Sequence, residues 1–198
     1  FKMKFKKIKP SIKVPVEISA RHIHLSKEDF EKLFGKNKKL ESVKKLSQPG
    51  EFASKNKIKI INGKEKLNAR ILGPLREYSQ AEISLTDAYT LKLNPLPKVR
   101  LSGDTYETTN VTIKGPKSQI KIPAIIAQRH LHCSEEQAKK IKLKDHQIVS
   151  VKINGQRKIT FHNVIVRISK KYSLSVHLDT DEANAAGISE KTFGEIIK

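Results

Sequence analysis

The sequence contains one cysteine and no long apolar segment. Because Cys133 is the only cysteine among 198 residues, it cannot form an intramolecular disulfide. No run of about 20 apolar residues occurs, so no membrane-spanning helix is expected. The N-terminus also has no apolar core with a small-residue cleavage site, which a secretory signal would have. These absences predict a cytoplasmic protein that does not associate with a membrane.

Arginine and aromatic residues are scarce, although the chain is strongly basic. The net charge is +20, but only seven of the 40 basic residues are arginines, and aromatic residues make up 6%. The lysines are spread along the whole chain with few aromatics between them, which is typical of a solvated surface and not of a nucleic-acid interface. We therefore expect no nucleic-acid partner. If the positive charge has a function, we expect it to attract phosphorylated ligands.

An internal repeat divides the chain. Its length allows one large domain or two of roughly 100 residues. The segment VPVEISARHIHLSKED at 14–29 aligns without a gap on IPAIIAQRHLHCSEEQ at 122–137, an offset of 108 residues. Both copies contain a hydrophobic residue before proline, then Arg-His-x-His and Ser-x-Glu. The repeat predicts two related lobes that face a shared site.

Short strands between turn signals dominate the chain. From about 40 to 125 these signals are SQPG, NGK, GPLR, NPLP, SGD and KGPK. Residues 146–178 have the same character, with a hairpin-like turn at Asn154-Gly155. Such spacing indicates an all-β barrel or sandwich.

The ends of the chain add a basic arm and short helices. Residues 1–13 carry six lysines and no sustained period, so we interpret them as an arm or tail. Residues 14–26 are predicted to form one strand. A helix should follow, with Ser26 at its N-cap and Gly35 as its end, and another helix is predicted over 181–189.

Two His-x-His pairs occupy equivalent positions of the repeat. Alternate side chains of a strand share a face, so His22 and His24 lie together, as do His130 and His132. Zinc accepts imidazole nitrogens, and catalytic zinc commonly has three protein ligands and an open position. The four histidines therefore predict one four-ligand site, or two sites that each need a further ligand. Cys133 points the other way, and we interpret it as a buried core thiol.

Further candidates lie elsewhere in the chain. The missing ligands could come from VHLDTD or QAEISLTD, which contain His177, Asp179, Asp181, Glu82 and Asp87.

Arg70 and Arg76 flank a Gly-Pro turn, and the guanidinium fork of arginine matches phosphate oxygens. An exposed strand arginine is the alternative, and the nearby Glu82 favours the functional interpretation. Ser102 could contact an anion or belong to a simple turn.

The ordered motifs resemble the PduL-type phosphate propanoyltransferases, also called phosphotransacylases. They are RHIHLS, LSQPGEFA, LGPLR with the following EIS-x-TDA, SGD, a second RHLH and VHLDTDEANAAG, and together they cover about 14–187. The resemblance implies a mainly β fold of two β-barrel domains with short capping helices, a dinuclear zinc site between the barrels, and a homodimer. The family pattern has Asn where this chain has Ala20.

The resemblance also implies domain bounds and residue roles. The first barrel would be discontinuous, formed by 14–20 and 128–198, and the second would be 21–127. The implied ligands of one zinc are His22, His24 and Glu82, and those of the other are His130, His132 and His177. Arg76 would bind phosphate and act in catalysis, Ser102 would be the active-site serine, and we assign Arg70 to binding coenzyme A.

The expected reaction moves a propanoyl or acetyl group between coenzyme A and inorganic phosphate. No activated nucleophile is evident, so we expect direct transfer in a ternary complex. Two alternatives are a zinc-dependent hydrolase of acyl or phosphoester substrates and a non-enzymatic nucleic-acid-binding protein. A microcompartment lumen is a second possible location, but Pro10 would break a targeting helix in the arm.

Overall fold

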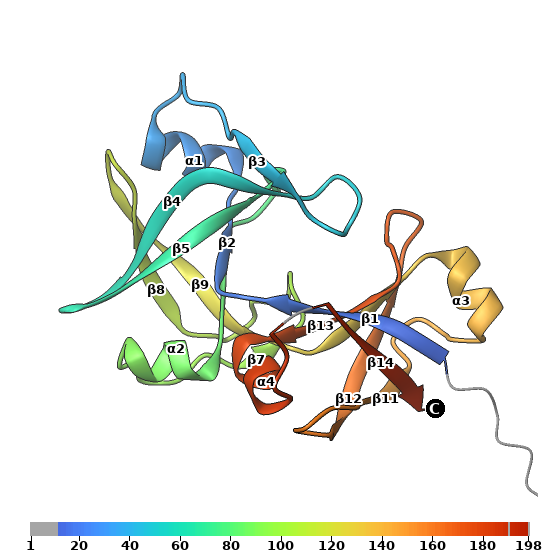
Figure 1. Cartoon of the computed structure of the whole chain (residues 1–198). Helices are drawn as coiled ribbons and strands as arrows, with labels where there is room; N and C mark the ends of the chain where they lie inside the picture. The colour runs from blue at the N-terminus through green and yellow to red at the C-terminus, as the bar shows by residue number, and fades with distance from the viewer. Residues whose placement is uncertain (1–11, 190, 198) are drawn as a thin grey trace, which may run out of the picture.

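The fold consists of two six-stranded β-barrels with short helices (Figure 1). The structure is a computed structural model that describes residues 12–189 and 191–197. Within these residues it has fourteen strands and four helices. The predicted fold class is confirmed. The basic arm lies outside the described residues except for residues 12 and 13, which begin the first strand.

The first barrel joins the start of the chain to its last third. Its core contains Val14, Leu131, Val151 and Val166, all fully buried, and Cys133, which confirms the interpretation of that thiol. Strand β1 pairs with β13 and β14, which closes the barrel. In their order around the barrel the strands are β1 (Ile12–Ser19), β13 (Ser175–Asp179), β10 (His130–Cys133), β12 (Ile159–Ile168), β11 (Ile148–Ile153) and β14 (Thr192–Ile197).

The second barrel is formed by the intervening residues. Its core contains Ile23, Ile60, Ile71 and Ile113, and the last three alternate with more exposed residues along their strands. Around the barrel the strands are β4 (Phe52–Asn62), β5 (Glu65–Gly73), β2 (His22–His24), β6 (Gln80–Ile83), β9 (Gln119–Ala127) and β8 (Asn110–Lys114), which pairs with β4. Two further strands flank it, β3 (Ser42–Lys45) on β4 and β7 (Val99–Arg100) on β9.

The chain changes barrel within each copy of the repeat. Strand β1 belongs to the first barrel and β2 to the second, whereas β9 belongs to the second and β10 to the first. The prediction of one strand over 14–26 is therefore wrong, because the backbone leaves its ladder at 20–21 (Figure 1). The two barrels have equivalent pairings: β2 lies between parallel β5 and antiparallel β6, and β10 lies between parallel β12 and antiparallel β13.

The helices follow from local capping signals. Helix α1 (Lys27–Phe34) begins after Ser26, whose side chain accepts from the Asp29 amide, and ends at Gly35 with φ of 102°, as predicted. Helix α4 (Thr180–Ala185) is shorter than the predicted 181–189, because the chain turns so that Ile188 packs into the first core. Two further helices, α2 (Leu85–Thr90) and α3 (Glu135–Ile141), were not predicted from the sequence. No helix in the described residues is long and apolar enough to span a bilayer.

Candidate metal centre and active site

The first polar group is formed by His22 and His24 on β2 and Glu82 on β6. His22 and Glu82 are opposite each other in the ladder. The Nε2 atoms of the two histidines are 3.1 Å apart. The Glu82 carboxylate oxygens are 3.6 Å from His22 Nε2 and 3.5 Å from His24 Nε2, and all three side chains are buried. Two imidazoles and a carboxylate thus converge on one point.

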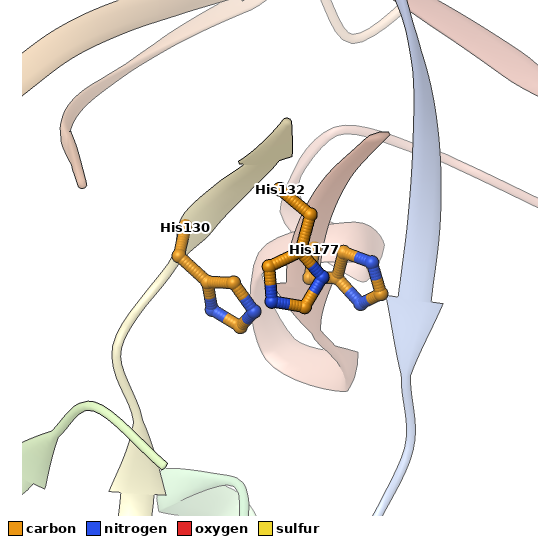
Figure 2. A group of neighbouring side chains, drawn as sticks. All are labelled: His130, His132 and His177. Carbon is orange, nitrogen blue, oxygen red and sulfur yellow. The ribbon is translucent and has the colours of Figure 1, made fainter. Parts of the chain in front are cut away.

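The second group occupies the equivalent position in the first barrel. His130 and His132 come from β10, and His177 comes from β13 directly opposite His130 (Figure 2). The rings of His130 and His177 stack with centroids 5.1 Å apart. Tyr172 stacks on His132 with centroids 4.0 Å apart. In both groups the possible ligand atoms lie within 4.8 Å of one another.

The barrel crossovers orient the first histidine of each pair. His22 Nδ1 is 2.9 Å from the carbonyl oxygen of Ala20, and His130 Nδ1 is 2.8 Å from that of Gln128. When Nδ1–H donates to a carbonyl, Nε2 keeps a lone pair for a metal ion. The interaction uses only the backbone of residue 20, so alanine serves in place of asparagine.

Burial keeps most of these imidazoles neutral. Desolvation lowers the pKa of His24 and of His177 to about 4, that of His130 to about 3 and that of His132 to about 2. For His22, desolvation also lowers the pKa, but the Glu82 carboxylate outweighs it and raises the pKa overall.

Glu82 is the one carboxylate in the two groups. Desolvation raises its pKa, but the charge and hydrogen bonds of His22 and His24 outweigh this effect and hold the pKa well below its usual range. At neutral pH the two groups therefore offer an ionised Glu82 carboxylate and, apart from His22, neutral imidazoles.

The donor set fits divalent metal ions. His24 Nδ1 and both ring nitrogens of His132 are buried without a hydrogen-bond partner, which is costly unless another group satisfies them. Imidazole and carboxylate are the ligand types that zinc accepts, and each group offers three of them. His22, His24 and Glu82 could hold one ion, and His130, His132 and His177 could hold another.

Both groups line one cavity of about 880 Å³, together with Arg70, Arg76 and Ser102. Its walls come from both barrels. The volume is in the range of small-molecule sites. Arg70 Nη1 donates to the Ser54 carbonyl at 2.8 Å, so this arginine is held by β4.

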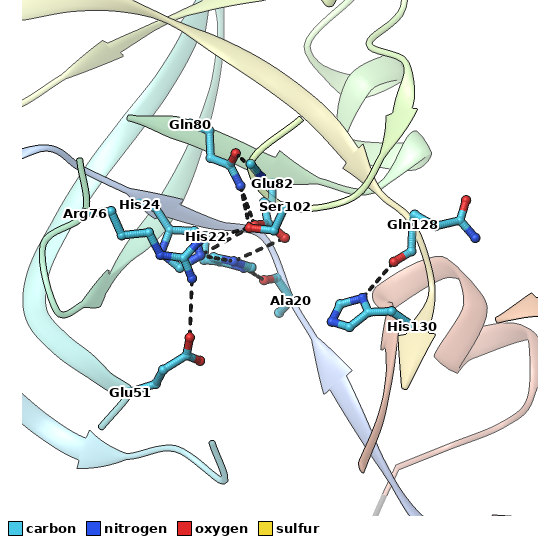
Figure 3. Close-up of polar contacts among 11 residues, drawn as sticks. Ala20, His22, His24, Glu51, Arg76, Gln80, Glu82, Ser102, Gln128 and His130 are labelled. Atoms are coloured by element: carbon cyan, nitrogen blue, oxygen red, sulfur yellow. Dashed lines mark hydrogen bonds and ion pairs between the residues drawn. The ribbon is translucent and has the colours of Figure 1, made fainter. Parts of the chain in front are cut away.

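Arg76 and Ser102 belong to a hydrogen-bond network beside Glu82 (Figure 3). Ser102 Oγ accepts from Arg76 Nη1 at 2.9 Å and from Gln80 Nε2 at 2.8 Å. Gln80 Nε2 also donates to Glu82 Oε1 at 2.6 Å, and Arg76 Nη2 is 3.3 Å from Glu51 Oε1. The Gln80 amide thus links the serine to the first group.

The other acidic candidates serve the helices. Asp87 and Asp179 are in the capping boxes of α2 and α4, and Asp181 accepts from the backbone amide of Thr86. None of them is in the two groups formed by the described histidines and acids.

Known proteins match this chain along most of its length. The family model for phosphate propanoyltransferase matches residues 15–189. The chain belongs to the phosphate propanoyltransferase family. The family resemblance and the prediction of an acyltransferase are both confirmed.

Three relatives named phosphate propanoyltransferase illustrate the similarity. One from Clostridioides difficile is 40% identical over 97% of this chain and 92% of its own length. One from Thermotoga maritima is 43% identical over 92% of this chain and 88% of its own. One from Listeria monocytogenes is 40% identical over 93% and 87%.

In this member of the phosphate propanoyltransferase family, the structure adds residues that sequence reasoning missed. The cavity is also lined by Gln48, Glu51, Arg167 and Tyr172, and Gln80 lies directly beside it. Gln48 and Glu51 are in the LSQPGEFA motif, and Gln80 is two residues from Glu82. Their positions in or beside these motifs could have indicated a role at the site. Nothing in the sequence around Arg167 or Tyr172 distinguishes them.

Proposed function

We propose that this protein moves a short acyl group, propanoyl or acetyl, between coenzyme A and inorganic phosphate at a two-zinc centre. The observation that carries the proposal is the convergence of two buried ligand groups on one cavity beside Arg76 and Ser102. Family membership supports the same reaction, since the named relatives are phosphate propanoyltransferases.

The six buried side chains would hold the metal ions. His22, His24 and Glu82 would bind one zinc, and His130, His132 and His177 the other. Bound zinc supplies Lewis acidity toward a carbonyl or phosphate oxygen and stabilises a leaving thiolate. The low pKa values of His24 and His177, both about 4, keep these ligands unprotonated at neutral pH.

Arg76 would bind and orient the phosphate. In the structure, Nη1 of its guanidinium donates to Ser102 and Nη2 lies near Glu51. A phosphate oxygen would compete with the Glu51 carboxylate for Nη2. Ser102 Oγ accepts two hydrogen bonds, so its own proton is available to an acceptor in the cavity.

Cations around the cavity would bind the phosphates of coenzyme A. Arg70, Lys44 and Lys57 line the cavity on the side of the second barrel. Their positive charge complements the pyrophosphate and ribose phosphate.

The transfer itself would be direct. A phosphate oxygen attacks the thioester carbonyl, the new C–O bond forms, and the C–S bond breaks to release coenzyme A as the thiolate. Arg76 would balance the charge that develops on the phosphate and carbonyl oxygens.

The test is release of free thiol from propanoyl-CoA by metal-loaded protein, with and without phosphate. The proposal expects release that depends on phosphate and is lost when zinc is stripped. Release that proceeds equally well without phosphate would favour a zinc hydrolase, and no phosphate-dependent release would reject the proposal. We also propose a homodimer, which light scattering of the full chain measures.

A further inference from the structure

A loop of the second barrel reaches across to the first. Residues 46–51 connect β3 to β4, and their central side chain is Gln48, which is 2% exposed. Gln48 Nε2 donates to the Ser173 carbonyl at 3.0 Å and to Ser175 Oγ at 2.9 Å. Its Oε1 accepts from the Ser173 amide at 3.1 Å. One buried amide therefore makes three hydrogen bonds to the other barrel.

The Ser175 hydroxyl that contacts Gln48 also contacts a candidate metal ligand. Its Oγ is 2.9 Å from His177 Nε2, and it is 2% exposed. In the ladder it is directly opposite His132. A hydrogen bond at one ring nitrogen of a histidine fixes the rotation of the ring and so sets the direction of the other nitrogen.

The two metal-ligand groups differ in where their support comes from. Glu82 is held by Gln80 Nε2, which belongs to the same strand β6. His177 is held through Ser175 by Gln48 of the opposite barrel. The first group is therefore supported within its own barrel, whereas the second needs the other barrel in place.

We propose that Gln48 is a positioning residue that holds His177 in its ligand orientation through Ser175. The group His130, His132 and His177 then binds zinc tightly only when the two barrels are docked. This inference rests on the proposed two-zinc function and adds to it a dependence of one metal site on the contact between barrels.

The test is a zinc titration of the metal-stripped full chain in competition with a chromophoric chelator. The variant Gln48→Met keeps the side-chain length and removes all three hydrogen bonds. In a His24→Ala background, where only the group with His177 remains complete, it should weaken zinc binding by about 10- to 100-fold, the usual effect of losing an outer partner. In a His130→Ala background, zinc binding to the other group should stay unchanged.

A control and a double-mutant cycle separate positioning from packing. Gln137→Leu removes a glutamine that caps α3 of the first barrel, and it should leave both affinities unchanged. Ser175→Ala should weaken the same group, and adding Gln48→Met to it should cost no more than about twofold further. If Gln48→Met does not fold, Ser175→Ala alone decides.

Unchanged affinity of the group with His177 in Gln48→Met or in Ser175→Ala overturns the inference while the proposed function stands. An equal loss at both groups also overturns it, because Gln48 would then have only a structural role. A wild-type chain that binds no zinc rejects the proposed function and this inference with it.

Discussion

At the scale of single residues, the site depends on groups whose ordinary behaviour is changed by burial. The six candidate ligands are at most partly exposed, and desolvation is the largest influence on the pKa of each. Arg76 is less buried and has hydrogen bonds to Ser102 and Glu51. A substitution of Arg76 therefore tests the reaction, and a substitution of a buried histidine tests stability in acid.

Arg76→Lys should impair phosphate binding and turnover. Lysine keeps the charge but loses the planar fork, so it cannot contact Ser102 and a phosphate oxygen together. We expect kcat/KM for phosphate to fall by roughly 100-fold, as on loss of one charge-stabilising donor. Steady-state kinetics measure this, with the exposed Arg157→Gln as a control of unchanged kinetics. Equal kinetics for Arg76→Lys and the wild type would contradict the assignment.

The metal-stripped protein should lose stability as the pH falls from about 6.5 to about 4. In the unfolded chain a histidine titrates near 6.5, but in the folded chain the pKa values of His24 and His177 are about 4 and that of His130 is about 3. Below 6.5 the unfolded chain therefore binds protons that the folded chain does not, which favours unfolding. The raised pKa of His22 acts in the opposite direction, but its contribution to stability is already complete below pH 6.5 and does not change the decline.

Thermal melting at a series of pH values measures this loss. His177→Asn removes one titrating imidazole and should flatten the decline in melting temperature. A melting temperature that stays constant between pH 6.5 and 4 would show that these imidazoles take up protons as readily in the folded chain as in the unfolded one.

At the scale of elements, each barrel crossover is tied to a helix. Arg21 Nη2 is 2.6 Å from Asp87 at the start of α2, and Arg129 Nε is 2.7 Å from Glu182 at the start of α4. Asp87 and Glu182 are both the third helical residue, where their carboxylates complete the capping boxes. The repeat thus conserves an ion pair as well as the histidines, and the pair fixes the point where the chain enters the next strand.

Arg21→Met should destabilise the fold. It leaves the Asp87 carboxylate, which is buried, with only its capping contact to the Ser84 amide. We expect the free energy of unfolding to fall by roughly 1–3 kcal/mol, the cost of leaving a buried polar group without its partner. Urea unfolding measures it. The variant Asp87→Asn removes the buried charge and should reduce the cost of Arg21→Met. An undiminished cost in that background would show that it does not come from the Asp87 carboxylate.

At the scale of the whole molecule, the net charge of +20 should act on the approach of the substrate. Acyl-CoA is a multiply charged anion, and exposed charges are screened as salt rises. We expect KM for propanoyl-CoA to increase between about 0.05 and 0.5 M salt. Initial rates over this range measure it.

Lys44 and Lys57 line the cavity, so the double variant Lys44→Gln/Lys57→Gln should reduce the salt dependence. Replacing Lys36 and Lys38, which are exposed and do not line it, is the matched control. A KM that does not respond to salt would show that the positive charge does not contribute to substrate binding.

Much of the fold and of the candidate site could be predicted from local signals. Ser26 and Gly35 bound α1 because capping depends on neighbouring residues. Alternation along a short strand put His22 and His24 on one side. The strand predicted over 14–26 failed because nothing in its pattern marks a change of barrel. The motif around Gln48 marked its position, but its role could not be predicted, because that role depends on a partner 125 residues away.

The sequence by itself determined that two equivalent histidine pairs exist, that the chain is mainly β, and which family pattern it follows. These properties depend on residue type and on spacing within a few positions. Only the tertiary structure decided that His177 faces His130, that Glu82 faces His22, and that both groups line one cavity. Those relations arise from strand register and from the two crossovers, which are set by packing between segments far apart in the chain.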